Sequence, residues 1–464
     1  MILHPDMSGA REDCAAGIRR LAQWATALPQ EEVPREVLAR AARVLTDDLA
    51  AIVGARDEPQ VAAFHRRVFE RARLEEATVF RGGRRRTDRV SAAVANAVAA
   101  DWLELDEGYR VTPCHAGLYV LPALLAEAEA RNLAFGEMLR ALALGYEIVT
   151  RVARAWKPRA MNMQSHGRYS AVGAAAGVAL ARGADAATLI AALGTAVTLI
   201  GPSPRNHLAE GILSRNMWPA AGAWSGSMAV EWAECGIAGA PGAFFDVYST
   251  ILGGEAQPQA LAEGLGERWA ILDGYTKIYA CCQHLHSAVE AAVGMRAALL
   301  AAGPLEDIAV VRVETHDLAL PLVNYRPETT LGAKFSMPHA VAAALVKGTG
   351  GAEAFAASTL DEPAVGSLRD RVKVAPWTPE LAPPNDRPAR VIVELRDGRS
   401  VRGECLSASG GPDRPLPLET VFGKLSALAA PAYPKIRPVF EGLAGLPEAR
   451  MLAGWADIVN EFCS

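Results

Sequence analysis

Three short segments of the chain gather side chains that can move protons or bind anions. The first covers residues 102–110 and 113–117 and holds Glu104, Asp106 and His115 between two apolar stretches. A histidine exchanges a proton near neutral pH, and a carboxylate beside it can fix the orientation of its ring. This segment predicts acid–base chemistry, although such a charged run is also typical of a solvated helix end.

The second segment, residues 161–170, leads into an alanine-rich stretch and contains His166 and Arg168. Ser170 can cap a helix that starts there, and the positive end of a helix attracts anions. The competing interpretation is a histidine with a structural or exposed position in a loop. The residues alone leave both interpretations open.

The third segment, residues 275–286, contains Lys277, Cys282 and His286, together with two tyrosines and a further cysteine and histidine. Cysteine and histidine are zinc ligands, but the spacing matches neither a CxxC pair nor an HExxH helix. We therefore expect no metal here. An ordinary loop that enters a helix is the alternative to a functional site.

A set of cations is spread over the middle of the chain and would suit a ligand with several carboxylates. Its members are Arg205, Arg215, Arg326 and Lys334. Each of them alone is typical of a surface charge. The sequence contains no phosphate loop, dinucleotide fingerprint or nucleophile elbow. From the residues alone, the prediction stops at a soluble two-domain protein that acts on or binds anions.

The composition excludes several classes of partner. The chain has 464 residues, of which 51% are hydrophobic and 21% charged, and a formal net charge of -5. This balance lacks the basic surface of a nucleic-acid binder. The seven cysteines form no disulfide framework and predict free thiols in a reducing compartment. No signal core begins the chain, and the apolar stretch 189–200 is too short for a membrane span, so we expect a soluble cytoplasmic protein.

The elements that must position these segments are mostly helices in the first two-thirds of the chain. Apolar residues recur at helical spacing from Leu38 to Ile52, and alanine-rich segments of high helix propensity follow. The predicted helices are 90–103, 121–129, 135–155, 170–181 and 186–200. The pattern predicts a bundle in which small residues let helices approach closely.

The character of the sequence changes after about residue 268. The stretch 308–315 alternates and is β-branched, and two further strands flank Asp397-Gly398, a strong hairpin signal. The predicted fold is mainly α, with a helical domain (1–268), a smaller α/β domain (269–403) and C-terminal helices (404–464). These last helices, at 418–428, 435–443 and 448–462, are expected to return to the helical domain, because alone they bury little surface.

Five motifs, in order along the chain, resemble those of the MmgE/PrpD family, which includes 2-methylcitrate dehydratase, cis-aconitate decarboxylase and iminodisuccinate epimerase. They lie at residues 47–54, 115–124, 145–151, 333–336 (Ala-Lys-Phe-Ser) and 411–424. The resemblance implies a large all-helical domain built from both chain ends and an α/β lid at about 269–403. It also implies a homodimer with its active site between the domains.

The same resemblance implies a set of site residues. His115 matches the family's active-site histidine, and Glu104 takes the place of the first aspartate in a run that continues with Asp106. His166 matches a second histidine if its loop is shifted. Lys277, Cys282 and His286 match the block K-x-Y-P-x-C and its trailing histidine, with Ala280 in place of proline. Arg215 takes a lysine position, and Tyr325 or a neighbour stands for the tyrosine of the lid.

These features favour a lyase without a cofactor, which removes water or CO2 from a small di- or tricarboxylate. His115 and His166 are the acid–base candidates, with Glu104 or Asp106 orienting one of them. Lys277 and Arg215 would hold substrate carboxylates and take up developing charge. Arg168, Cys282, His286 and Tyr325 complete the expected contacts with substrate. A competing assignment makes Lys277 the base, with its pKa lowered by burial and by Arg215.

Two other functions stay open. One is a cofactor-independent epimerase or isomerase of an amino- or imino-dicarboxylate, favoured by residues 326–330, which resemble the lid of the epimerase. The other is a binding protein that keeps the fold without catalysis. It is favoured by the departures from the family pattern at Glu104, Arg215 and residues 165–170.

Overall fold

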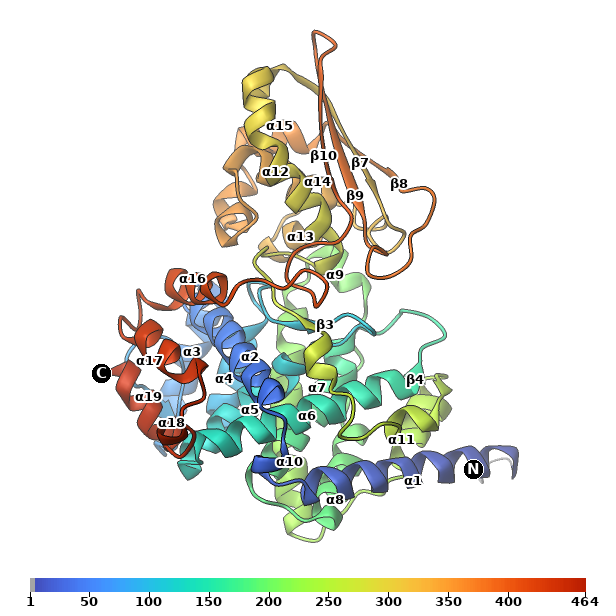
Figure 1. Cartoon of the computed structure of the whole chain (residues 1–464), viewed down its shortest axis with the longest axis vertical. Coiled ribbons are helices and arrows are strands. Elements are labelled where there is room, and N and C mark those ends of the chain that lie inside the picture. Colours follow the sequence, from blue (N-terminus) through green and yellow to red (C-terminus); the bar gives the residue numbers. More distant parts are fainter. Residues whose placement is uncertain (1–4) are drawn as a thin grey trace.

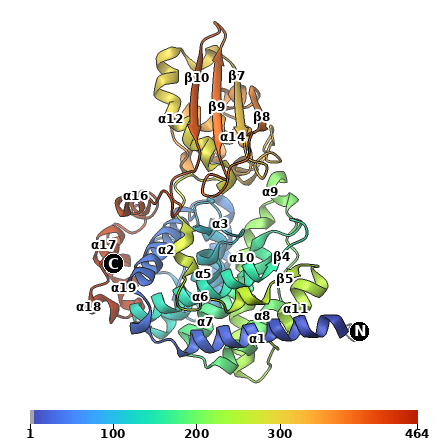
Figure 2. The same cartoon turned by 45° about the vertical axis from the view of Figure 1, so that its right-hand side comes forward.

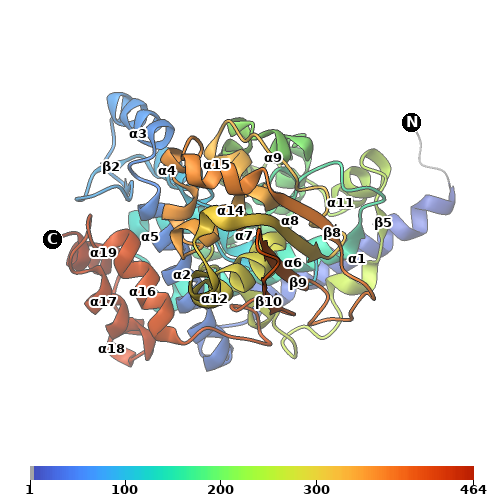
Figure 3. The same cartoon turned by 90° about the horizontal axis from the view of Figure 1, so that it is seen from above.

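The computed structural model describes residues 5–464 as a helical body with a smaller unit, built on a β-sheet, above it (Figure 1). Both ends of the described chain lie in the body (Figure 2). Seen along the long axis, the second unit lies over the central helices of the body (Figure 3). The fold is mainly α, as the sequence predicts.

The body contains most of the helices and a few two-residue strands that tie its loops together. Its helices are α1 (Pro5–Ala27), α2 (Arg35–Gly54), α3 (Pro59–Arg71), α4 (Arg89–Ala100), α5 (Ala116–Arg131), α6 (Phe135–Ala155), α7 (Ser165–Ala181), α8 (Ala186–Thr198), α9 (Asn206–Glu210), α10 (Trp218–Glu234) and α11 (Ala243–Phe245). Its strands pair as β1 (Ala77–Thr78) with β2 (Arg86–Thr87), β3 (Gly108–Tyr109) with β6 (Gly274–Tyr275), and β4 (Trp156–Lys157) with β5 (Glu255–Ala256).

Helices α5, α7 and α10 pack closely because small residues line their contacts. A Cβ atom on Gly173 of α7 would lie 2.7 Å from the Cβ of Tyr119 on α5. A Cβ on Gly226 of α10 would lie 2.5 Å from the carbonyl oxygen of Ala171 on α7. Close-packed interiors do not accommodate such overlaps, so glycine is required at both contacts. The alanine-rich segments thus form the tight centre of the body.

The second unit is a four-stranded sheet with helices on one side (Figures 1 and 2). The sheet has the order β10-β9-β7-β8, in which only β7 and β8 are parallel. Its elements are α12 (His286–Ala302), β7 (Ile308–Thr315), α13 (Thr330–Lys334), α14 (Met337–Lys347), α15 (Pro363–Arg369), β8 (Val372–Pro376), β9 (Ala389–Leu395) and β10 (Ser400–Cys405). Alternate residues of β9 are buried, as the pleat of a half-covered sheet requires.

The predicted hairpin is confirmed. β9 and β10 pair in antiparallel register, with Ser400 opposite Glu394. Gly398 in the turn has φ +87°, a conformation that glycine adopts without strain. The Asp397-Gly398 signal therefore identified both the turn and the pairing of its flanking strands.

The C-terminal helices lie against the body, as the sequence predicts. They are α16 (Leu418–Ala429), α17 (Ile436–Ala444), α18 (Glu448–Met451) and α19 (Trp455–Cys463). α16 packs on α2, and α19 packs on α5. A buried ion pair between Lys424 of α16 and Asp47 of α2, 2.7 Å long, joins the two ends of the chain. The domain boundaries after residues 268 and 403 stay predictions.

One helical segment, Gln283–Ala302, is long and apolar enough to cross a membrane by length and composition only, with a mean hydropathy of 1.2. It includes α12, which packs on β9, β10 and α14, and half of it is buried. Core helices of globular units pass the same test. The cysteines of the chain are all free, as the sequence predicts.

Candidate active site

A cavity of about 120 Å³ lies where the second unit meets the body. Phe335 and Arg387 of the second unit contribute to its wall. The charged and reactive side chains in the wall include Glu104, His115, Arg168, Arg205, Arg215, Lys277, Cys282, His284 and Arg387. Segments that are distant in the sequence therefore meet around one cavity.

The loop between α4 and α5 carries most of the acidic groups near this cavity. Hydrogen bonds from helices of the body fix the backbone of this loop. Asp48 of α2 accepts a hydrogen bond of 2.8 Å from the backbone N–H of Glu107. The Lys424 ammonium of α16 donates one of 2.5 Å to the carbonyl oxygen of Leu105. These bonds satisfy buried backbone groups and fix the position of the loop.

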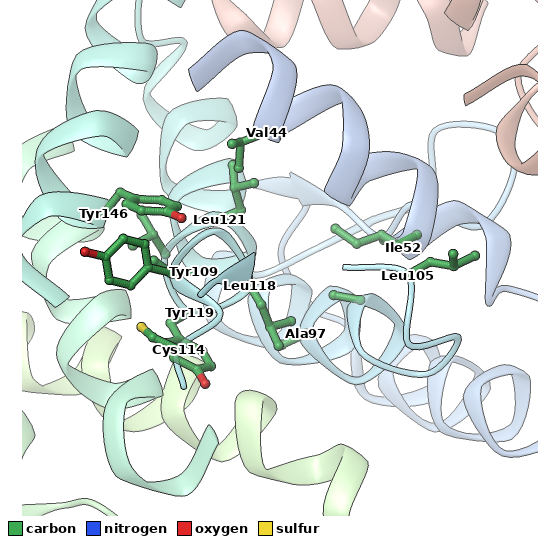
Figure 4. Close-up of a cluster of buried hydrophobic side chains, with 14 of the residues drawn as sticks. Val44, Ile52, Ala97, Leu105, Tyr109, Cys114, Leu118, Tyr119, Leu121 and Tyr146 are labelled. Carbon is green, nitrogen blue, oxygen red and sulfur yellow. The ribbon is translucent and has the colours of Figure 1, made fainter. Parts of the chain in front are cut away.

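Apolar side chains pack beneath the same loop (Figure 4). Leu105 and Ile52 of α2 belong to this buried cluster, and Tyr109 contacts Tyr146 of α6 edge to face, with ring centres 6.4 Å apart. Directly before Leu105, Glu104 has φ +54°, a left-handed conformation that is uncommon outside glycine. Such strain persists where the surroundings determine the conformation, and it is frequent at functional sites.

His115 is bound on one side of its ring and open to the cavity on the other. Its Nδ1 lies 2.6 Å from Asp106 Oδ2 and 2.9 Å from the carbonyl oxygen of Glu107. Because a carbonyl oxygen only accepts, Nδ1 carries the proton, and in the neutral ring Nε2 is unprotonated. This arrangement suits a base that takes a proton from a molecule in the cavity.

His166 lies behind His115 and is not part of the cavity wall. The two ring centres are 5.0 Å apart and the rings are nearly perpendicular. His166 Nδ1 lies 2.9 Å from the Tyr119 hydroxyl, and its Nε2 lies 3.3 Å from Asp101 Oδ1. Burial, and then Arg215 and His115, hold the pKa of His166 well below its usual value. The role of His166 as an acid–base candidate stays a prediction.

Two buried cations and three buried carboxylates form a single cluster of ion pairs. Nη1 of Arg215 contacts Asp101 and also lies 2.5 Å from Glu104 Oε1. Nζ of Lys277 lies 3.5 Å from Glu104 Oε2 and 3.6 Å from Asp106 Oδ1. Glu104 therefore bridges the two cations, and Asp106 connects the cluster to His115.

The three carboxylates of this cluster are also close enough to share a metal ion. One oxygen each from Asp101, Glu104 and Asp106 lies within 4.8 Å of the others. The same carboxylates contact Arg215 and Lys277 in the structure. The chain's own cations thus already compensate their charge, and a bound ion would compete with these contacts.

The ion pairs determine the charge states at the centre of the site. Burial acts to lower the pKa of Lys277, but Asp106 and Glu104 outweigh it and raise that pKa well above its usual value. Lys277 is therefore an ammonium at neutral pH. The expectation of a lowered pKa, on which its assignment as a base depends, is wrong in direction.

The two aspartates behind the histidines titrate differently. Burial acts to raise the pKa of Asp106, but Lys277 and then His115 outweigh it, so that this pKa falls below its usual value. Burial raises the pKa of Asp101 to about 6, although Arg215 acts against the shift. Asp106 is therefore a permanent negative charge, whereas Asp101 is close to its titration range near neutral pH.

Most of the predicted site residues meet at the cavity. Its wall includes Glu104, His115, Arg168, Arg215, Lys277 and Cys282, with Asp106 and His166 directly behind. Two expected substrate contacts are not brought there. His286 Nε2 lies 3.1 Å from the Cys281 carbonyl oxygen, and the Tyr325 hydroxyl donates to the Val372 carbonyl oxygen at 3.0 Å. Substrate contacts by these two residues stay predictions.

The cation set of the sequence separates into three locations. Arg205 and Arg215 line the cavity. Lys334 is buried beside the cavity, and its ammonium donates a hydrogen bond of 2.7 Å to the carbonyl oxygen of Trp102. Burial lowers the pKa of Lys334 to about 8. Arg326 is exposed and pairs with Asp370 on the surface. Two of the four cations therefore reach the cavity.

Three functional candidates were missed by sequence reasoning: Asp101, Tyr119 and Arg387. Asp101 immediately precedes the first segment, and its partner Arg215 follows 114 positions later, so nothing local reveals the pair. Tyr119 lies one helical turn after His115, a spacing that could have indicated a shared face. Arg387 comes from an irregular loop without a motif.

Comparisons with known proteins agree with this geometry. The profile of the MmgE/PrpD N-terminal domain matches residues 19–252, and that of the MmgE/PrpD C-terminal domain matches residues 279–438. The cis-aconitate decarboxylase-like protein oryM of Aspergillus oryzae is 25% identical over 438 residues, covering 88% of this chain and 90% of the relative. Cis-aconitate decarboxylase of Aspergillus terreus is 25% identical over 449 residues, 88% of each chain. These likenesses support a lyase-type function in general, and the chain belongs to the MmgE/PrpD family.

Proposed function

We propose that this protein is a lyase that needs no cofactor and removes CO2 or water from a small di- or tricarboxylate. The observation that carries the proposal is the position of His115, which lines the cavity and is fixed on Asp106 through Nδ1. Lys277 and Arg215 line the same cavity, where they can hold the carboxylates of such a substrate. The names of the two Aspergillus relatives favour loss of CO2 as the first reaction to test.

In the proposed reaction, the substrate lies with one carboxylate on Lys277 and the carbon next to it facing His115. When CO2 leaves, the electron pair of the broken C–C bond spreads toward the adjacent carboxylate, where fixed cations stabilise it. His115, protonated at Nε2, then delivers a proton to carbon, and Asp106 stabilises the imidazolium beforehand. In a dehydration, neutral His115 instead removes the α-proton, and the Lys277 ammonium protonates the departing hydroxyl group.

Proton NMR of the purified protein in D2O tests this proposal with citrate-like, aconitate-like and aspartate-derived acids. A lyase removes a carboxylate or produces a new vinyl signal. Exchange of an α-proton without change of the carbon skeleton would instead establish the epimerase alternative. Silence across the panel would contradict catalysis and leave a binding protein.

We further propose that the protein is a cytoplasmic homodimer. An apolar groove lined by α4, α10 and neighbouring loops supports the dimer, and it includes Phe64, Val98, Trp218 and Trp224. Trp224 is 48% exposed and Met217 at the rim is 50% exposed. Contiguous exposed aromatic surface of this kind is typical of protein interfaces. A second copy of the chain is the partner that the family resemblance implies.

A further inference from the structure

Three arginines from separate segments line the cavity outside the central ion-pair cluster. Arg168 lies on α7, Arg205 precedes α9, and Arg387 lies in the loop between β8 and β9 of the second unit. Arg205 and Arg387 are partly exposed, whereas the central cations Arg215 and Lys277 are fully buried. The cavity therefore has an inner and an outer group of cations.

The inner cations are compensated and the outer ones are not. Arg215 and Lys277 share three carboxylates. Among the side chains of residues 8–464, neither Arg168 nor Arg205 has a carboxylate oxygen within 4.0 Å. Arg387 has only Asp386 at 3.8 Å, and that carboxylate also binds Arg110. An anion from solution is the group that such a concentration of positive charge favours.

Buried donors in this outer group also lack partners. The Nε atoms of Arg168 and Arg387 have no hydrogen-bond acceptor within the described side chains and backbone, and Nδ1 of His284, another residue of the cavity wall, has no partner there either. An unpartnered buried donor costs free energy, and more when it is charged. A ligand oxygen placed here would recover that cost at several donors together.

The electrostatics of the neighbours agree with this picture. Burial, and then Arg387, His316 and Arg205, hold the pKa of His284 well below its usual value. Burial and then Arg110 lower the pKa of Arg387. The outer wall is therefore positive enough to disfavour further protonation, and a bound carboxylate would relieve the repulsion.

We propose that Arg387 and Arg205, assisted by Arg168, form a second carboxylate subsite that binds the end of the substrate remote from His115. This proposal rests on the proposed function, because the ligand is a substrate only if the protein is a lyase. It names the residues that determine specificity in the same cavity. Arg387 comes from the second unit and Arg205 from the body, so a ligand in this subsite contacts both. Molecules with a single carboxylate lack the group that the subsite recognises.

The test compares two non-reacting ligands, glutarate and butyrate, which differ by one carboxylate. Dissociation constants are measured by ligand-observed NMR at fixed ionic strength for the wild-type protein and for Arg387→Gln, Arg205→Gln and Arg387→Lys. Arg326→Gln is the matched control, because it removes an equal charge from the exposed surface of the second unit.

The wild-type protein is expected to bind glutarate more tightly than butyrate. Arg387→Gln should weaken glutarate binding by about 10-fold or more, as loss of a charge-assisted hydrogen bond requires, and butyrate binding by less than about 2-fold. Arg387→Lys should recover part of the loss, and Arg326→Gln should change neither constant by more than about 2-fold. Arg205→Gln should behave like Arg387→Gln and serves if that variant does not fold.

Equal weakening of both ligands, no weakening in either glutamine variant, or no preference for glutarate in the wild-type protein would overturn the subsite. Because neither ligand reacts, the result is independent of turnover. The expected binding pattern without turnover of any acid would preserve the subsite and reject the lyase. Turnover by the wild-type protein, with an unaltered ligand preference in Arg387→Gln, would preserve the lyase and reject the subsite.

Discussion

The charges at the centre of the site fix the orientation of one histidine and keep one lysine protonated at neutral pH. His115 and Lys277 both contact Asp106, whose carboxylate is ionised because these neighbours outweigh its burial. The same carboxylate thus orients the ring of the histidine and raises the pKa of the lysine. His115 and Lys277 line the same cavity, so the different environment of each group determines its role in proton transfer.

Replacement of Lys277 by methionine tests its assignment as a carboxylate-binding ammonium. Because the pKa of Lys277 is raised, we expect Lys277→Met to weaken substrate binding by about 10-fold or more, together with a lower kcat. Isothermal titration with a non-reacting dicarboxylate and steady-state kinetics measure the two effects separately. Loss of kcat with unchanged affinity would contradict carboxylate binding and favour a role of Lys277 in proton transfer.

Glu107 provides a prediction about pH and stability. Burial raises its pKa to about 7, so the folded protein holds a proton that the unfolded chain, with an ordinary glutamate near pKa 4.3, releases earlier. This contribution to folding is complete below about pH 4 and is lost as the pH rises to about 7, amounting to about 3 kcal/mol. Glu107→Gln keeps a neutral side chain and should not show this loss.

Urea unfolding of both proteins at several pH values measures the difference. The free energy of unfolding of Glu107→Gln, relative to wild type, should increase from pH 4 to pH 7. Glu36→Gln on the exposed side of α2 is the control and should lack the trend. A difference independent of pH would show that Glu107 is not buried as a neutral acid.

At the residue scale, the sequence predicted the side chains but not their pairing. His115, Lys277 and Arg215 were identified through motifs, because their segments resemble the family's blocks. Asp101 was missed, because its contact with Arg215 exists only after two distant segments pack together. His286 was included because it ends a motif, yet its ring binds the Cys281 carbonyl oxygen instead.

At the element scale, periodicity predicted most helices and the hairpin, while their ends depended on tertiary contacts. The predicted helix at 448–462 is divided into α18 and α19. Backbone bonds from Phe135 to Ala453 and from Trp455 to Leu133 separate them, because the chain pairs briefly with the start of α6. Such pairing has no local sequence signal.

The close packing of α7 and α10 predicts opposite effects for two glycine substitutions. Gly226→Ala places a methyl group against the Ala171 carbonyl and should destabilise the protein by about 1–3 kcal/mol. Gly423→Ala in α16 meets no atom within 4 Å and should stabilise it by up to about 1 kcal/mol through helix propensity. Thermal unfolding measures both. Equal effects would contradict the tight α7–α10 contact.

At the scale of the whole molecule, the cavity depends on both units, and the proposed dimer depends on the groove at α10. Trp224→Glu should convert a dimer to a monomer, because a charge there replaces apolar interface. Leu452→Glu, at a residue 71% exposed in the C-terminal region, is the control and should remain dimeric. Sedimentation velocity distinguishes the states. A wild-type monomer, or a dimeric Trp224→Glu variant, would reject this interface.

The measurement that tests the central claim most directly follows one acid in D2O by proton NMR, using the acid of the panel that the wild-type protein consumes fastest. Wild type and Asp106→Asn are compared, with Asp397→Asn in the exposed hairpin turn as the control. The account predicts loss of CO2 or water in the wild type and control, and turnover slower by about 10²–10⁴-fold in Asp106→Asn, whose His115 has lost its orienting carboxylate. Turnover of Asp106→Asn within about 10-fold of wild type, or no turnover by the wild type, would contradict it.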